Sequence, residues 1–260
     1  MKLAAILIAS ASAALLLAAC QAPEETAEEA ADEAAREGAG AEAQADALLP
    51  DEIAGLLPLR GFGHEPNWHV RVEAETTTLY RQTDPIVSFP TRARQDASGG
   101  VHLQDPDGLA HVAFARAVCR DIATGMPHPF TVSAQTDEDA FQGCGGDPET
   151  LFSGIDWTLG ELEGETFVSE GELSIRFDEG RVSGASGCNR FMGGYELTGE
   201  MLTLTQMAST QMACSQDGVM EQELRLLEVL SDVQMFDLTD EGDLVLRTGR
   251  NETVTARREH

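Results

Sequence analysis

Hydrophobic and polar residues alternate with a period of two along much of the second half of the chain. Residues 173–177 place Leu, Ile and Phe on one side and Ser and Arg on the other. The same spacing recurs at 202–204, 236–238 and 244–246, each next to a turn that contains glycine. Alternation of this kind between turns predicts short antiparallel strands with one buried face.

One segment departs from this alternation and is typical of a helix. Residues 217–233, DGVMEQELRLLEVLSDV, have acidic residues in their first turn and apolar residues at helical spacing. The apolar stripe is predicted to consist of Val219, Met220, Leu224, Leu227 and Leu230. One helix that covers short strands indicates an α+β or barrel-like unit.

The first half of the chain also carries strand patterns. Residues 68–72 alternate after a turn at Pro66, and further strands are predicted at 78–80, 86–87, 101–103 and 111–114. A glycine-rich break follows at 143–154. We therefore predict a mainly β to α+β chain with two small antiparallel β domains, at 58–148 and 154–258.

The start of the chain has the layout of a secretory signal, predicted to span residues 1–19. A positive charge at Lys2 precedes an apolar run that is too short for a comfortable membrane span. The tetrapeptide LAAC, which ends at Cys20, resembles the lipobox of bacterial lipoproteins. That resemblance implies cleavage before Cys20, a diacylglycerol on its sulfur and an acyl chain such as palmitate on its amine. A plain signal peptide with an incidental cysteine is the alternative.

The residues after Cys20 predict a tether and indicate a cellular compartment. Between Cys20 and residue 50, nine acidic residues and one arginine leave little that could be buried, so we predict a disordered acidic spacer. Residue 21 is Gln where Asp resembles an inner-membrane retention signal, which favours the outer membrane, facing the periplasm. The formal net charge is −28 and no basic stripe is present, which argues against nucleic acid as a partner.

Four cysteines follow Cys20. An even number in an exported chain predicts two disulfides, and three connectivities are possible. The spacings of 25 and 26 residues favour nearest neighbours, Cys119 with Cys144 and Cys188 with Cys214. Two reduced pairs are the alternative.

Several separate motifs in the second half resemble one known family. They are Trp157-x-Leu159, SGASGCNRF (183–191), Tyr195 and MASTQMAC (207–214). Together, and in this order, they resemble the META domain of HslJ-type heat-shock lipoproteins over residues 154–258. The resemblance implies a small antiparallel β-roll or barrel with one helix, found in bacterial envelope proteins and without an established biochemical activity.

The first half bears a second resemblance. The pattern G-x-E-P-x-W at 63–68, together with the closing pattern bounded by Cys119 and Cys144, resembles an uncharacterised envelope-lipoprotein domain. No activity is implied by it.

The glycine-rich stretch SGASGC, residues 183–188, allows three hypotheses: a nucleophile, a metal ligand or a turn held by a bridge. Gly184 and Gly187 permit a tight bend that a Cys188–Cys214 disulfide would hold. Ser186 lacks the G-x-S-x-G frame, and residues 154–258 contain no histidine that could act as its base. We therefore expect a structural turn.

The histidines of the first half do not form a recognised metal motif. In HEPNWH, His64 and His69 are five residues apart, and Pro66 prevents the helix that a zincin motif requires. His69 is expected to face solvent. Asp121 is expected to cap a turn, with an acid–base role as the alternative, and Glu65 with Trp68 could line a ligand groove.

These observations favour a monomeric, non-catalytic, lipid-anchored periplasmic protein that acts as a binding or stress-response module. Its expected partners are the membrane, through the anchor, and an envelope protein or small ligand. We expect no catalytic residue, cofactor or metal. The alternatives are an inhibitor of a secreted hydrolase such as lysozyme, since an acidic surface suits a basic target, and an envelope hydrolase that uses the His and Asp residues of the first domain.

Overall fold

The computed structural model describes residues 51–169 and 171–258. The predicted signal, Cys20 and the predicted tether lie outside the described residues. No helix among the residues described is both long and apolar enough to cross a membrane.

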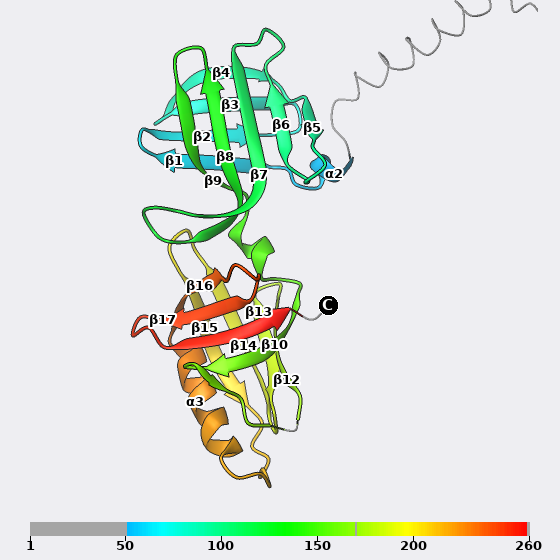
Figure 1. The fold of residues 1–260 in the computed structure, drawn as a ribbon, viewed down its shortest axis with the longest axis vertical. Helices are drawn as coiled ribbons and strands as arrows, with labels where there is room; N and C mark the ends of the chain where they lie inside the picture. The colour runs from blue at the N-terminus through cyan, green and yellow to red at the C-terminus, as the bar shows by residue number, and fades with distance from the viewer. Residues whose placement is uncertain (1–50, 170, 259–260) are drawn as a thin grey trace, which may run out of the picture. The chain divides into compact units, whose positions relative to one another are not determined.

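The first β unit is a nine-stranded antiparallel sheet preceded by the short helix α2 (Asp51–Ala54) (Figure 1). The strand order is β4-β3-β2-β1-β9-β8-β7-β6-β5. The strands are β1 (Leu59–His64), β2 (Asn67–Val72), β3 (Thr76–Arg81), β4 (Asp84–Pro90), β5 (Ala93–Gln95), β6 (Val101–Gln104), β7 (Ala110–Arg120), β8 (Pro127–Thr136) and β9 (Ala140–Gly145). Alternate residues of these strands point into one core, which includes Trp68, Leu79, Val132 and Phe141.

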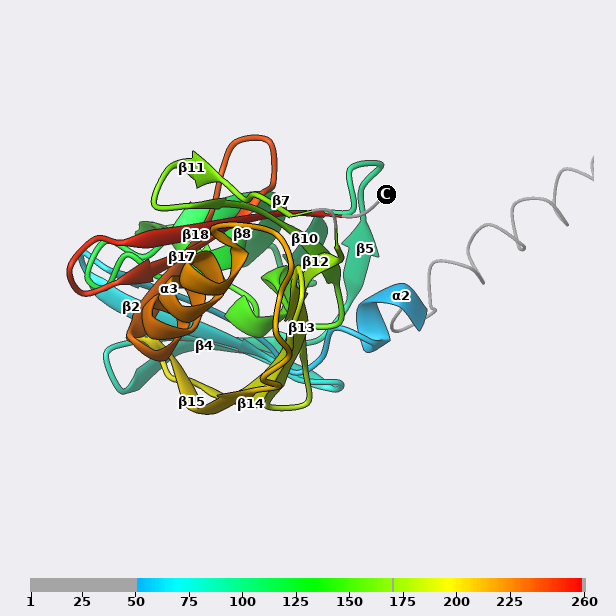
Figure 2. The same ribbon diagram turned by 90° about the horizontal axis from the view of Figure 1, so that it is seen from below.

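The second β unit follows the 3-10 turn η1 (Pro148–Leu151). Its strand order is β15-β14-β13-β12-β10-β18-β17-β16, with β11 paired to β10. The strands are β10 (Asp156–Leu162), β11 (Glu165–Thr166), β12 (Leu173–Asp178), β13 (Arg181–Ser186), β14 (Arg190–Leu197), β15 (Leu202–Ser209), β16 (Val233–Leu238), β17 (Leu244–Thr248) and β18 (Thr253–Arg258). The helix α3 (Val219–Ser231) packs against β15, β17 and β18 (Figure 2).

This second sheet curls toward a barrel without closing. Its end strands, β15 and β16, lie near each other but are not paired. Trp157, Phe152 and Phe177 form part of its core, and the Trp157 indole N–H donates to the Phe152 carbonyl at 2.9 Å. The prediction of a mainly β chain with two antiparallel sheets and one helix of more than a turn is confirmed for the described residues.

The predicted face of the helix is partly wrong. The residues of α3 that are buried are Val219, Glu223, Leu226, Val229 and Leu230. Met220 and Leu224, which we expected in the buried stripe, are 49% and 68% exposed. The buried residues still repeat at helical spacing, but one of them is acidic. A stripe chosen from apolar residues alone therefore lies on a face that is turned away from the core.

Candidate functional site

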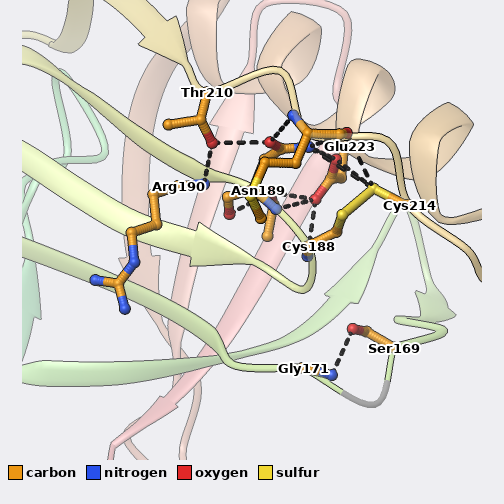
Figure 3. Close-up of a disulfide and its surroundings, with 10 residues drawn as sticks. Ser169, Gly171, Cys188, Asn189, Arg190, Thr210, Cys214 and Glu223 are labelled. Carbon is orange, nitrogen blue, oxygen red and sulfur yellow. Dashed lines mark hydrogen bonds between the residues drawn. A yellow bond between two sulfur atoms is a disulfide. The ribbon is translucent and has the colours of Figure 1, made fainter.

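The acidic residue on the buried face of α3 is the centre of a hydrogen-bonded cluster. Glu223 is 6% exposed. Its Oε1 accepts from the Ser186 hydroxyl at 2.8 Å and from the backbone N–H groups of Cys188 at 3.0 Å and Asn189 at 2.7 Å. Its Oε2 accepts from the Asn189 side-chain amide at 2.7 Å (Figure 3). The loop between β13 and β14 is therefore fixed onto α3.

These bonds determine the charge of Glu223. Burial alone raises the pKa of a carboxyl group, because it disfavours the ionised form. The donors from Asn189, Ser186 and Cys188 outweigh burial and hold the pKa of Glu223 below its ordinary value. Glu223 is therefore a carboxylate at neutral pH and is poorly suited to donate a proton.

Asn189 extends the cluster to the segment after β15. Its Oδ1 accepts from the Thr210 hydroxyl and from the Met212 backbone N–H, both at 2.8 Å. The same side chain donates to Glu223, so one buried amide holds two segments of chain together (Figure 3). The Cys188–Cys214 disulfide joins these two segments a second time.

Glycine is required at one position in the loop that carries Cys188 and at one position in β13, the strand before it. Gly187 has a φ of 107°, which L side chains rarely adopt. A Cβ at Gly184 would clash with the carbonyl oxygen of Ser174 on the neighbouring strand. The turn expected for residues 183–188 is therefore confined to Gly187 and Cys188, because residues 183–186 belong to β13. Ser186 is 2% exposed and its hydroxyl is used within the cluster, so it has none of the exposure of a nucleophile.

The two sulfurs and Glu223 also lie within metal-ligand distance of one another. The Sγ atoms of Cys188 and Cys214 and a carboxylate oxygen of Glu223 are all within 4.8 Å. A cysteine binds a metal as a thiolate, whereas both of these sulfurs are used in the disulfide. The group therefore lacks the thiolates that a metal site of this type needs.

A groove of about 400 Å³ opens beside this cluster. Residues 209–213 line one side, and Met220, Leu224 and Leu227 of α3 line the other. Met212 is 58% exposed and Leu224 is 68% exposed. Glu223 and Asn189 line the groove as well but are almost completely buried. Its exposed surface combines polar side chains from Ser209, Thr210 and Gln211 with apolar ones from Met212, Met220 and Leu224.

The first β unit contains a second buried acid. Asp121 is 6% exposed and lies 2.7 Å from His64 Nε2. It also accepts from the Thr124 hydroxyl and the Ala123 backbone N–H. Burial raises the pKa of Asp121, but these hydrogen bonds outweigh it and the pKa lies below its ordinary value. Asp121 thus ties the turn after β7 to the end of β1, which agrees with the capping role.

The other candidate residues of the first unit, His69 and Trp68, take no part in the hydrogen bond between His64 and Asp121. His69 is half-buried rather than solvent-facing and stacks on Tyr80 with ring centroids 4.4 Å apart. Burial, and then the charges of Arg71 and Arg60, lower its pKa. The hypothesis of a ligand groove lined by Trp68 and Glu65 needs correction. Trp68 is 2% exposed, and its indole N–H donates to the Gln142 carbonyl inside the unit.

Each of the four cysteines after Cys20 is bonded to the one nearest to it in sequence among the four. Cys119 is bonded to Cys144 and Cys188 to Cys214. One bridge therefore lies in each β unit, which is the connectivity that the spacing favoured.

Comparison with protein families matches residues 150–260 to the META domain. Residues 150–260 are a META domain. The Glu223 cluster and its groove both lie within it. A META domain suggests a non-catalytic, envelope-associated module.

Two solved structures are similar to part of this chain. One is described as the NMR structure of the protein from Burkholderia xenovorans; it is 22% identical, covers 42% of this chain and 85% of its own, and has a TM-score of 0.36. The other, described as an NMR structure of the protein, is 28% identical, covers 42% and 92%, and has the same TM-score of 0.36. No curated protein matches the chain.

Sequence reasoning missed Glu223 as the centre of the META domain's cluster. A signal was present, because Glu223 falls at helical spacing between Val219 and Leu226. We expect acids on a helix to face solvent, and the partners that make burial tolerable are more than thirty residues away in sequence.

Proposed function

We propose that this chain is a lipid-anchored periplasmic protein of the outer membrane that holds a partner in the groove of its META domain, as a non-catalytic binding or stress-response module. The observation that carries the proposal is the groove itself. Its exposed apolar wall, Met212, Met220 and Leu224, stands on a base fixed by Glu223, Asn189 and a disulfide.

The arrangement supports binding more than catalysis. A rigid base with apolar walls favours burial of a ligand surface without prior ordering of the site. Methionine side chains adapt to apolar surfaces of different shape. The one ionised group in the base, Glu223, has donors on both oxygens and has little capacity left for a substrate.

The sequence supports the anchor. Acylation at Cys20 would add buried CH₂ groups worth about 0.8 kcal/mol each, enough with several chains for stable attachment. The acidic segment up to residue 50 would then act as a spacer between the bilayer and the two β units.

Site-specific photo-crosslinking in cells tests the groove. A photoreactive residue at Leu224 should give a defined crosslinked species in the envelope fraction. The same residue at Met192, which is 66% exposed but does not line the groove, serves as the matched control. Loss of the Leu224 species in a Met212→Glu background would support the groove. Identical crosslinks from both positions would contradict it.

The anchor has a separate test. Replacing Cys20 by Ser should move the protein from the membrane fraction to the soluble periplasmic fraction. Continued membrane association of that variant would contradict attachment through Cys20.

A further inference from the structure

Two arginines lie directly opposite each other on neighbouring strands of the first β unit. Arg60 of β1 and Arg71 of β2 are register partners, and both side chains are exposed. The residues on either side of Arg71, Val70 and Val72, are fully buried, so Arg71 points to the outer face of the sheet. Arg60 lies on the same face, because directly opposed residues of an antiparallel pair point to one side, with Cβ atoms about 5 Å apart.

Neither of these arginines is neutralised by a neighbouring acid. Among the residues that the structure describes, no carboxylate lies within ion-pair distance of Arg60 or Arg71. Like charges directly opposite each other on paired strands are destabilising. The chain has 45 acidic residues and 17 basic ones, so the charge of the chain as a whole does not account for an unneutralised pair of cations. A bound anion would remove the repulsion.

The next row of the same face holds two half-buried rings. His69 and Tyr80 are register partners, and their rings stack with centroids 4.4 Å apart. The Arg71 guanidinium carbon lies 5.9 Å from the centroid of the Tyr80 ring. Burial, and after it the charges of Arg71 and Arg60, lower the pKa of His69. Both guanidinium groups therefore act on the same imidazole, so their positive fields overlap on this face.

Hydroxyl groups continue the row of the two arginines. Thr78 of β3 is the register partner of Arg71, and Ser88 of β4 is the register partner of Thr78. The Ser88 hydroxyl donates to Thr78 Oγ1 at 3.0 Å, which leaves the Thr78 hydroxyl its own hydrogen to donate. The row of Arg60, Arg71, Thr78 and Ser88 thus offers hydrogen-bond donors and contains no acidic residue.

We propose that Arg60, Arg71 and Thr78 form a binding site for a phosphomonoester on the outer face of the first β unit. A phosphomonoester has three terminal oxygens and carries about 1.5 to 2 negative charges at neutral pH, which two guanidinium groups balance. Each guanidinium can donate two parallel N–H bonds to these oxygens. A carboxylate has two oxygens and a single charge, so it would engage only one of the arginines. This site is independent of the groove in the META domain.

NMR titration with glycerol 3-phosphate tests the site. The protein is the full chain carrying Cys20→Ser, at neutral pH and constant ionic strength. The probe should shift the side-chain resonances of Arg60 and Arg71 and raise the pKa of His69, because a bound dianion offsets the charges that lower it. Acetate should bind about tenfold more weakly or worse. Unchanged resonances, or equal affinity for acetate, would overturn the proposal.

Charge substitutions provide the second test. Arg60→Gln and Arg71→Gln should each weaken binding of glycerol 3-phosphate by about tenfold or more. Neither should lower the midpoint of thermal unfolding, since each removes a like-charge contact. Arg181→Gln is the matched control, because Arg181 is also an exposed strand arginine without an ion-pair partner among the described residues. Equal weakening by all three variants would indicate general attraction to positive charge and would contradict the site.

Vesicles distinguish a lipid headgroup from a soluble phosphomonoester. Phosphatidic acid presents a phosphomonoester, whereas phosphatidylglycerol presents a phosphodiester. A lipid ligand should retain the Cys20→Ser chain on phosphatidylcholine vesicles that contain phosphatidic acid, but not on phosphatidylglycerol vesicles of equal surface charge, and Arg71→Gln should abolish retention. Binding of glycerol 3-phosphate without retention on either vesicle assigns a soluble ligand. Equal retention on both vesicles that persists in Arg71→Gln would contradict a role for these arginines.

Discussion

Each β unit contains a disulfide with a buried carboxylate nearby, but the two carboxylates are held in different ways. In the first unit, Asp121 accepts from a threonine hydroxyl, a backbone N–H and His64, which is itself ionisable. In the META domain, Glu223 accepts only from a hydroxyl, two backbone N–H groups and the amide of Asn189. None of the partners of Glu223 titrates in the range where proteins are folded.

The surroundings of the two acids differ as well. Asp121 fixes a turn at the end of a hairpin. Glu223 fixes the base of a groove whose opposite walls expose Met212 and Leu224. A buried charge is stable only with a full set of partners. In the META domain this requirement fixes the loop and the segment after β15, and so it also fixes the groove.

Loss of a disulfide should have the largest effect and should separate the two units. Replacing Cys188 and Cys214 together by Ala should cost about 2–5 kcal/mol of unfolding free energy, and replacing Cys119 and Cys144 should cost a similar amount because the loops are of nearly equal length. Only the first double variant should also lose the crosslink from a photoreactive residue at Leu224, since it frees the segment that lines the groove. Denaturant unfolding and the crosslinking assay measure the two effects.

The tryptophans allow each unit to be followed alone. The chain has two, Trp68 in the first core and Trp157 in the second. Single-tryptophan variants should report a lower midpoint in the unit that lost its bridge. A Cys188/Cys214 variant that lowers only the Trp68 transition would contradict this assignment.

Replacing Glu223 or Asp121 by its amide should lower the free energy of unfolding by less than loss of a disulfide does, and by different amounts for the two residues. Glu223→Gln places an amide NH₂ where the carboxylate faces donors only, and it should cost about 1–3 kcal/mol. Asp121→Asn can still accept from Thr124 and turn its NH₂ toward His64, losing only the 3.3 Å bond from the Ala123 N–H. A cost of about 1 kcal/mol is therefore expected. Chemical denaturation of both variants gives the comparison. An Asp121→Asn cost that exceeds that of Glu223→Gln would reverse the ranking.

The dependence of stability on pH follows from the pKa of Glu223. Its pKa is lower in the folded protein than the ordinary value of 4.5. A lowered carboxyl pKa contributes stability that is present above the unfolded value and is lost as pH falls through the folded value. The difference in unfolding free energy between the parent and Glu223→Gln should therefore shrink as pH falls below 4.5. A difference that stays constant through acid titration would show that the charge of Glu223 contributes nothing.

The smallest effect is expected for Ser186→Ala. The hydroxyl is one of four groups on Glu223, so its loss should cost about 1 kcal/mol and leave the crosslink from Leu224 intact. Thermal unfolding and the crosslinking assay check both parts. Loss of binding in a folded Ser186→Ala protein would reveal a direct role that the geometry does not indicate.

The local features of this protein could be read from its sequence, whereas the base of the site could not. The alternation at 173–177 corresponds to β12. The turn predicted for SGASGC is shorter than expected, because residues 183–186 belong to β13 and the loop begins at Gly187. The pattern predicts the helical segment but misplaces its inward face, because a stripe of apolar residues leaves out Glu223. The ligand groove proposed at Trp68 is likewise wrong. The alternation of Trp68 with polar neighbours correctly predicts a strand, but it places Trp68 in the core.

The sequence by itself determined which segments become strands or helix, since a period of two or of 3.6 depends only on neighbouring residues. Its four cysteines beyond Cys20 also allowed one bridge for each half of the chain. The tertiary structure alone decided that Glu223 faces inward and that Asn189 holds residues 210–212. The burial of a charge depends on partners brought together by folding, and those partners lie on strands and loops distant in sequence.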